Sequence, residues 1–215
     1  MKKELTELVF ILDKSGSMMG LEKDTIGGYN SMLEKQKAVE GQCRITTVLF
    51  DHDYELLHDR IDLEAVGPIS GKEYQVGGST ALLDAIGRTI HKIANVQKNT
   101  AKEHRAEKIL FVIITDGEEN SSREYSAQKV KDLIEKQKTK YDWEFIFLGA
   151  NIDAVETAGR FGIAPDRAVD YLADSQGTKL NYDAMSKTVA GFRATGAVNT
   201  AYLEEIRDDV KKRRK

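Results

Sequence analysis

Short apolar runs alternate with helix-patterned segments along most of this chain, and this alternation restricts the fold more than any other feature. The runs fall at residues 8–12, 44–50, 108–115, 143–148 and 168–172. The helical patterns fall at residues 21–40, 81–97, 124–138, 153–161 and 176–192. Continuous apolar runs are typical of strands buried on both faces of a parallel sheet. The sequence therefore predicts an α/β fold, with a doubly wound, mostly parallel sheet of about six strands and helices on both faces.

One strand of this sheet is expected to run against the others. Residues 54–58 follow the strand at 44–50 after only three polar residues, Asp51, His52 and Asp53. A link this short joins antiparallel strands, because a parallel pair needs a long crossover. The run at 108–115 is the most apolar in the chain, and we place it at the centre of the sheet.

The length of 215 residues fits one large domain or one domain with an appendage. We expect a first unit at residues 1–175 and a helical extension at residues 176–215, packed on or trailing the same domain. A polar helix is expected after residue 200. The basic run at residues 211–215 suits the carboxyl end of that helix, where cations interact favourably with the helix dipole.

Charge and cysteine content restrict the class of partner and the compartment. The net charge of −3 disfavours nucleic-acid binding through overall charge. The single cysteine, Cys43, leaves no disulfide within the chain and is expected to be a buried, inert thiol. The first apolar run is too short for a signal peptide, and no run is long enough to span a membrane. We therefore expect a cytoplasmic protein without a membrane partner.

Oxygen donors gather in three polar loops. The first loop, after the strand at 8–12, carries Asp13, Ser15 and Ser17; the second carries Thr80 just before a helix; the third follows the central strand with Asp116. In open α/β sheets, ligands bind beyond the carboxyl ends of the strands. These two carboxylates and three hydroxyls include no imidazole or thiolate, and such a set suits Mg2+, Mn2+ or Ca2+ better than zinc.

Together these loops resemble one known family. The Asp13-x-Ser15-x-Ser17 element, the Gly-Ser-Thr80 loop and the Thr115-Asp116-Gly117 element are similar to the metal-ion-dependent adhesion site of the von Willebrand factor A domain. The order of strands and helices resembles that family over residues 5–172. Residues 150–200 look like an extension found in small bacterial or phage members.

The resemblance implies a role for each site residue. Ser15 and Ser17 would bind the ion directly, and Thr80 would engage or withdraw with the conformational state. Asp13 and Asp116 would hold metal-bound waters. The implied function is a divalent-cation-dependent protein-binding module, with Mg2+ as the expected ion, that captures an Asp or Glu side chain of a partner. Family analogy suggests an AAA+ ATPase as one such partner.

Residues beside the five donors are expected to line the ligand-binding surface; they are Lys14, Gly16, Ser79, Gly117 and Glu118. Glu118 and Glu119 would strengthen cation capture through their local field or open the following helix favourably. In the first case they would also repel an acidic partner unless Lys14 or Arg123 offset their charge.

Other chemistries fit the sequence less well, but one stays open. The loop after Asp13 lacks the glycine of an EF-hand, and the phosphate-binding GxxxxGK[ST] pattern is absent. The haloacid dehalogenase pattern would require an Asp where this chain has Ser15. None of the four histidines lies in the three loops, although His52 is close in sequence to a strand end. A metal-dependent hydrolase acting on phosphoesters is the alternative function, and a shift of a C-terminal helix on ligand binding is expected only by analogy.

Overall fold

The computed structural model describes residues 5–214. Within them a single six-stranded sheet has the order β3-β2-β1-β4-β5-β6. The strands are β1 (Leu5–Asp13), β2 (Gln42–Phe50), β3 (Tyr54–Asp62), β4 (Lys108–Thr115), β5 (Glu144–Ala150) and β6 (Ala168–Tyr171). All neighbours pair in parallel except β2 and β3. The predicted fold class, the antiparallel strand and the central place of β4 are thereby confirmed.

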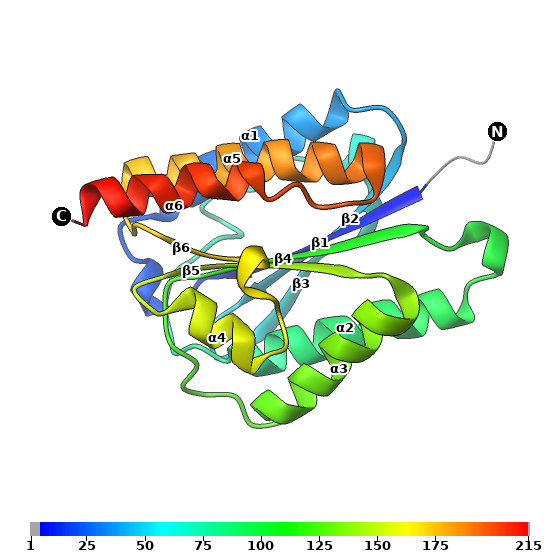
Figure 1. Cartoon of the computed structure of the whole chain (residues 1–215), viewed down its shortest axis with the longest axis horizontal. Coiled ribbons are helices and arrows are strands. Elements are labelled where there is room, and N and C mark those ends of the chain that lie inside the picture. The colour runs from blue at the N-terminus through cyan, green and yellow to red at the C-terminus, as the bar shows by residue number, and fades with distance from the viewer. Residues whose placement is uncertain (1–4, 215) are drawn as a thin grey trace.

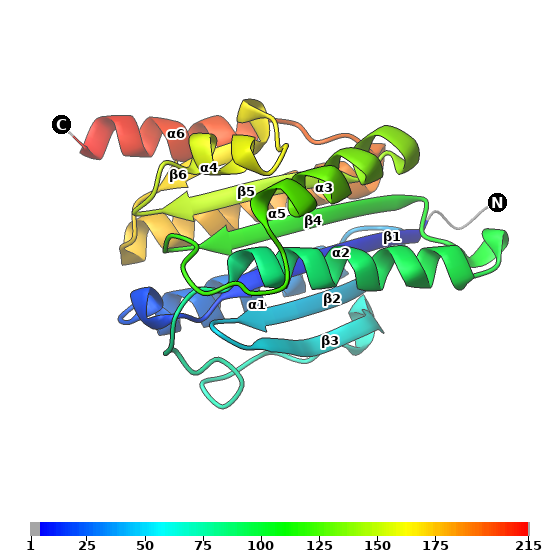
Figure 2. The same ribbon diagram turned by 90° about the horizontal axis from the view of Figure 1, so that it is seen from below.

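Helices cover both faces of the sheet, as Figure 1 shows. The α-helices of the described residues are α1 (Glu22–Lys37), α2 (Leu82–Asn99), α3 (Ala127–Tyr141), α4 (Ala154–Arg160), α5 (Ser175–Thr195) and α6 (Ala201–Arg213). Helices α1, α5 and α6 lie on one face, and α2, α3 and α4 lie on the other. Figure 2 looks onto the second face and shows the strand order beneath α2 and α3.

The pleat of each strand divides the core into two layers. Side chains alternate across a strand, so Leu8, Phe10 and Leu12 of β1 join the cluster under α1 and α5. Val9 and Ile11 point to the other face and join the cluster under α2 and α3. Every residue of β1 is buried, as expected for a strand between two parallel neighbours.

Several elements differ from the sequence prediction at their ends, and two of these differences have a clear physical cause. β3 continues to Asp62, four residues beyond the predicted end, with a bulge in its pairing with β2. β3 is an edge strand whose side chains are mostly only half buried, so its last residues can be polar. Their polarity gave no strand pattern in the sequence. Helix α3 begins at Ala127 instead of residue 124, because the Ser126 side chain accepts a hydrogen bond from the Lys129 amide and caps the helix.

The C-terminal helices are packed against the rest of the fold. Residues 175–195 form one helix, α5, which lies beside α1. The buried Arg193 side chain donates to the main-chain carbonyls of Gln36, in the last turn of α1, and of Val39 and Gly41, just beyond it. The side-chain amide of Gln36 donates in turn to the main-chain carbonyl of Ser186. The division into units at residues 1–175 and 176–215 stays a prediction.

Gly28 sets the distance between α1 and α5. A Cβ at Gly28 would lie 2.4 Å from the Tyr182 ring, whereas a Cβ at Gly27 would meet nothing within 4 Å. We expect Gly28→Ala to lower the free energy of unfolding by about 1–3 kcal/mol through overpacking. Gly27→Ala, one residue earlier in the same helix, should raise it by up to about 1 kcal/mol through helix propensity. Urea unfolding followed by circular dichroism measures both, and equal effects of the two changes would contradict the packing argument.

None of the helices in residues 5–214 combines the length and the apolar character needed to cross a membrane. Cys43 is buried, as expected, and burial raises the pKa of its thiol to about 12.

Candidate metal centre

Asp13 ties two of the three loops together where β1 ends. Its buried carboxylate accepts hydrogen bonds from the Ser15 amide at 2.7 Å and from the Thr115 hydroxyl at 2.6 Å. The Asp116 amide approaches the same carboxylate at 3.3 Å. Because β1 and β4 are adjacent parallel strands, their carboxyl ends meet, and Asp13 is well placed to join them.

Ser15 and Ser17 present their hydroxyls side by side. Residues Gly16–Met18 form a short 3-10 turn that follows Ser15, and the two Oγ atoms lie 3.0 Å apart. Ser15 is buried, whereas Ser17 is exposed. The loop therefore carries one donor inward and one at the surface.

The second loop is held against the first and third through its main chain. The Gly16 amide donates to the Gly78 carbonyl at 3.0 Å, and the Gly77 amide donates to the Lys14 carbonyl at 2.9 Å. On the other side, the Thr80 amide donates to the Asn120 side chain at 2.9 Å, and the Asn120 amide donates back to the Thr80 carbonyl at 3.0 Å. These bonds place Thr80 where the three loops meet, and its side chain is buried there.

Gly117 shows how close the hydroxyls of the first two loops come to the third. The position that a Cβ would take on Gly117 lies 3.0 Å from Ser17 Oγ and 3.4 Å from Thr80 Oγ1. These two atoms come from segments more than sixty residues apart in the chain. The structure thus brings Asp13, Ser15, Ser17, Thr80 and Asp116 to one place at the edge of the sheet.

Asp116 is oriented by a residue from the neighbouring strand end. The Asn151 side-chain amide donates a hydrogen bond to Asp116 Oδ1. Burial raises the pKa of Asp116 to about 6, and the nearby Asp13 charge adds to the rise while the Asn151 bond opposes it. Burial likewise raises the pKa of Asp13 against the hydrogen bonds it accepts. The two buried carboxylates repel each other, and this creates a local need for positive charge.

The flanking residues have different surroundings. Lys14 donates to Glu55 at 3.0 Å and lies 3.9 Å from Asp51, so its charge is already paired. Ser79 and Glu118 are exposed beside the loops. Glu119 accepts hydrogen bonds from the Leu83, Ser121 and Ser122 amides. It therefore caps the start of α2 and does not open α3, which begins eight residues later.

Sequence reasoning missed the residues that hold the donors in place. They are Thr115 and Tyr74, which donate to Asp13, and Asn120 and Asn151, which fix Thr80 and Asp116. Thr115 ends β4 and Asn120 lies in the loop that follows it. A polar residue at the end of an apolar strand can be recognised from the sequence alone. Asn151, directly after β5, offered the same signal, whereas Tyr74 lies in a segment without helix or strand and gave none.

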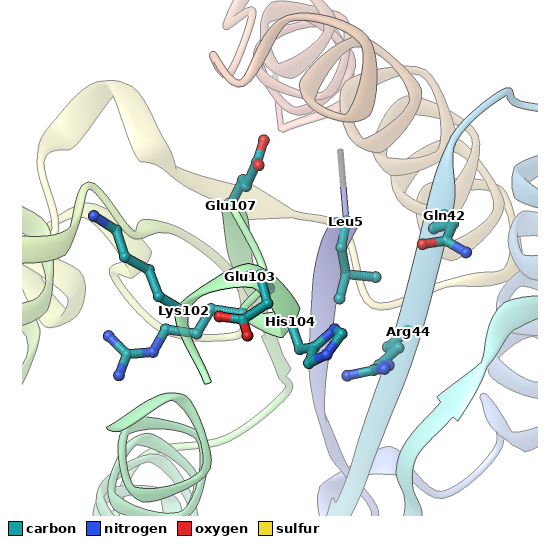
Figure 3. Close-up of a pocket in the computed structure, with 9 residues that line it drawn as sticks. Leu5, Gln42, Arg44, Lys102, Glu103, His104 and Glu107 are labelled. Carbon is teal, nitrogen blue, oxygen red and sulfur yellow. The ribbon is translucent and has the colours of Figure 1, made fainter. Parts of the chain in front are cut away.

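Two other features lie outside this cluster. Asp51, His52 and Asp53 bring one potential ligand atom each within 4.8 Å of the others, and the His52 ring lies close against Gly78 of the second loop. A cavity of about 880 Å3 lies at the opposite edge of the sheet, where β1 and β2 begin; Figure 3 shows Leu5, Gln42 and Arg44 beside charged residues of the link before β4. That cavity is not part of the candidate metal centre.

The sheet order, the two helical layers and the three joined loops define a von Willebrand factor A fold. Proximal thread matrix protein 1 from the mussel byssus, solved with a zinc-occupied metal-ion-dependent adhesion motif, has a TM-score of 0.58 at 13% identity over 86% of this chain and 46% of its own. A von Willebrand factor type A protein from Catenulispora acidiphila gives 0.56 at 14% identity over 87% and 43%. The ArnB paralog VWA2 from Sulfolobus acidocaldarius gives 0.52 at 16% identity over 87% and 44%.

These similarities establish the fold, and the chain spans less than half the length of each of the three proteins. No protein-family model matches the sequence, and no curated protein matches it as a relative.

Proposed function

We propose that this chain is a divalent-cation-dependent protein-binding module whose ion is held by Asp13, Ser15, Ser17, Thr80 and Asp116. The observation that carries the proposal is the position of Gly117, whose missing side chain leaves Ser17 Oγ and Thr80 Oγ1 facing a common space beside Asp116. Any larger residue there would fill that space. A glycine at this point fits a binding cradle better than a simple turn.

The donor set fits a hard cation. It consists of hydroxyl and carboxylate oxygens, and burial raises the pKa of both carboxyls, so a bound cation would offset the charge that the fold confines there. We propose Mg2+, with Mn2+ or Ca2+ as substitutes. The zinc in the mussel protein belongs to that protein, and the oxygen-only donors here favour harder ions.

Each residue has a distinct proposed part. Ser15, Ser17 and Thr80 supply neutral ligands, while Asp13 and Asp116 balance the charge and hold water. When bound, the ion supplies an electron-poor open position that accepts a carboxylate from outside. The proposed partner is therefore a protein that presents an Asp or Glu side chain. An AAA+ ATPase is one candidate by family analogy, and a cytoplasmic setting is proposed with it.

Isothermal titration of the EDTA-treated chain with Mg2+ tests the proposal. We expect one site, lost in Asp13→Ala and retained in Asp132→Ala, a change on the surface of α3 away from the loops. A pull-down with and without Mg2+ then tests whether partner capture depends on the ion. Absence of binding, or binding that survives Asp13→Ala, would rule the proposal out.

The hydrolase alternative is separated by a turnover assay. Our proposal expects no Mg2+-dependent hydrolysis of p-nitrophenyl phosphate by the purified chain. Turnover that disappears in Asp116→Ala would replace the binding module with a metal-dependent phosphoesterase.

Asn151 offers a sharper test of the geometry. It adopts φ +55° and orients Asp116 without belonging to the five donors. Asn151→Gly removes the amide without backbone strain, and we expect the affinity for Mg2+ to fall by about tenfold to 100-fold, as for other residues that orient metal ligands. Asp142→Gly is the matched control, because Asp142 also has φ +55° but ends α3. Titration calorimetry should show an unchanged affinity for the control.

A further inference from the structure

A groove between the second halves of α2 and α3 is built differently from the metal centre. Figure 2 shows the two helices side by side over the sheet. The groove encloses about 370 Å3, within the range of pockets that bind small molecules. It lies on the face covered by α2 and α3, and none of the five proposed metal ligands lines it.

The floor of the groove is apolar. Ile109 and Trp143 are buried there, and Ala94, Ala106 and Leu133 are only partly buried where they line it. Tyr141 lies at the same groove with 57% of its surface exposed. The core is therefore incompletely covered at this groove. The aromatic and aliphatic side chains there offer an apolar surface to a ligand.

The charged side chains that line the groove are all cations. Lys98, Arg105 and Lys136 line it, and no aspartate or glutamate of the described residues does. No ion pair or hydrogen bond of the side chain is found for Lys98 or Lys136 within residues 5–214, whereas Arg105 is held by the carbonyls of Thr100 and Lys98. The Gln97 Nε2 atom is buried without a partner among the same residues, so one donor is also unsatisfied.

We propose that this groove binds a small organic anion with a flat apolar body, such as an aryl carboxylate or an aryl sulfonate. The apolar floor disfavours a free inorganic anion, and the unopposed cations disfavour a neutral ligand. The enclosed volume suits a small molecule. The site is independent of the proposed metal centre and can fail or succeed without it.

Trp143 makes the test direct, because it is the only tryptophan in the chain and lines the groove. Its ring stacks on that of Phe111, with 5.5 Å between the ring centroids. The probe is 8-anilinonaphthalene-1-sulfonate, added to the full-length folded chain with excitation of Trp143. We expect saturable quenching of Trp143 with energy transfer to one bound dye per chain. Inorganic sulfate should not displace the dye, and Ala94→Phe should block its binding by filling the groove.

Paired variants test the role of charge. Lys98→Gln with Lys136→Gln should raise the dye's Kd by about fivefold to tenfold, as expected for two exposed ion pairs. The control pair, Lys129→Gln with Lys179→Gln, makes the same charge change at exposed sites outside the groove and should leave Kd unchanged. Binding of the neutral N-phenyl-1-naphthylamine should be equally strong in both double variants.

Three results would overturn the proposal. The first is the absence of saturable quenching, and the second is equal weakening of dye binding by the two double variants. The third is Trp143 emission that changes with protein concentration in the absence of dye, which would show that a second copy of the chain covers the groove. All four lysine changes are at exposed positions, so the comparison does not depend on a variant that fails to fold.

Discussion

Replacing Arg60 by Met is expected to lower the free energy of unfolding by about 3 kcal/mol, because it leaves a buried carboxylate without its cation. Glu7 is fully buried in β1, and Arg60 Nε donates to it at 2.8 Å. The pairing of β2 with β3 is irregular beside Arg60, between His58 and Ile61. Such a bulge changes the direction in which the side chains of a strand point. Met keeps much of the side-chain volume, so the change removes charge and hydrogen bonding with little loss of packing.

The loss should depend on pH. Burial raises the pKa of Glu7 above its ordinary value of 4.5, while Arg60 opposes the rise. The folded chain therefore holds the Glu7 proton more tightly than the unfolded chain. The contribution of Glu7 to stability is then largest at low pH and is lost as the pH rises from 4.5 through the folded pKa. Without Arg60 the folded pKa rises further, so the penalty of Arg60→Met should shrink in acid and grow towards neutral pH.

Urea unfolding at a series of pH values measures this effect. Glu7→Gln combined with Arg60→Met should recover much of the loss, because no buried charge is left. Arg160→Met is the matched control: its pair with Glu156 is exposed on α4, and its removal should cost less than about 1 kcal/mol. If Arg160→Met and Arg60→Met cost the same, the buried pair has no special role.

Mg2+ should stabilise the wild-type chain by about 2.7 kcal/mol at a free concentration of 100 times Kd, because the proposed site is assembled only in the folded state. Asp13→Asn should abolish this gain. The asparagine carbonyl can still accept from the Ser15 amide, and its NH2 group can donate to the Thr115 hydroxyl oxygen, so both loop contacts persist without the charge; only the long contact with the Asp116 amide is lost. In EDTA the variant should be at least as stable as the wild type, since burial already disfavours the Asp13 carboxylate.

Thermal or urea unfolding in Mg2+ and in EDTA measures this linkage. Asp132→Asn, on the exposed surface of α3, should gain as much stability from Mg2+ as the wild type. A full Mg2+ response in Asp13→Asn would place the ion elsewhere, and the Asp51, His52 and Asp53 group would then be the next site to test.

The sequence by itself determined the class of fold. The continuous apolar runs within β1 and β4 predict strands buried on both faces, and their alternation with helical patterns favours a doubly wound sheet. It also determined the candidate donors, because Asp13 and Asp116 stand directly at the ends of those strands and short-range polarity at a strand end is visible without coordinates.

Only the tertiary structure decided what holds these donors and what lies elsewhere on the molecule. The partners of Asp13 and Asp116, namely Tyr74 and Asn151, and the pairing of Arg60 with Glu7 join residues 35 to 61 positions apart. The groove beside Trp143 likewise depends on how α2 and α3 pack beside each other. Local patterns report which face of an element is apolar; which polar side chains meet across elements is set by strand register, bulges and helix packing, and these exist only in the folded chain.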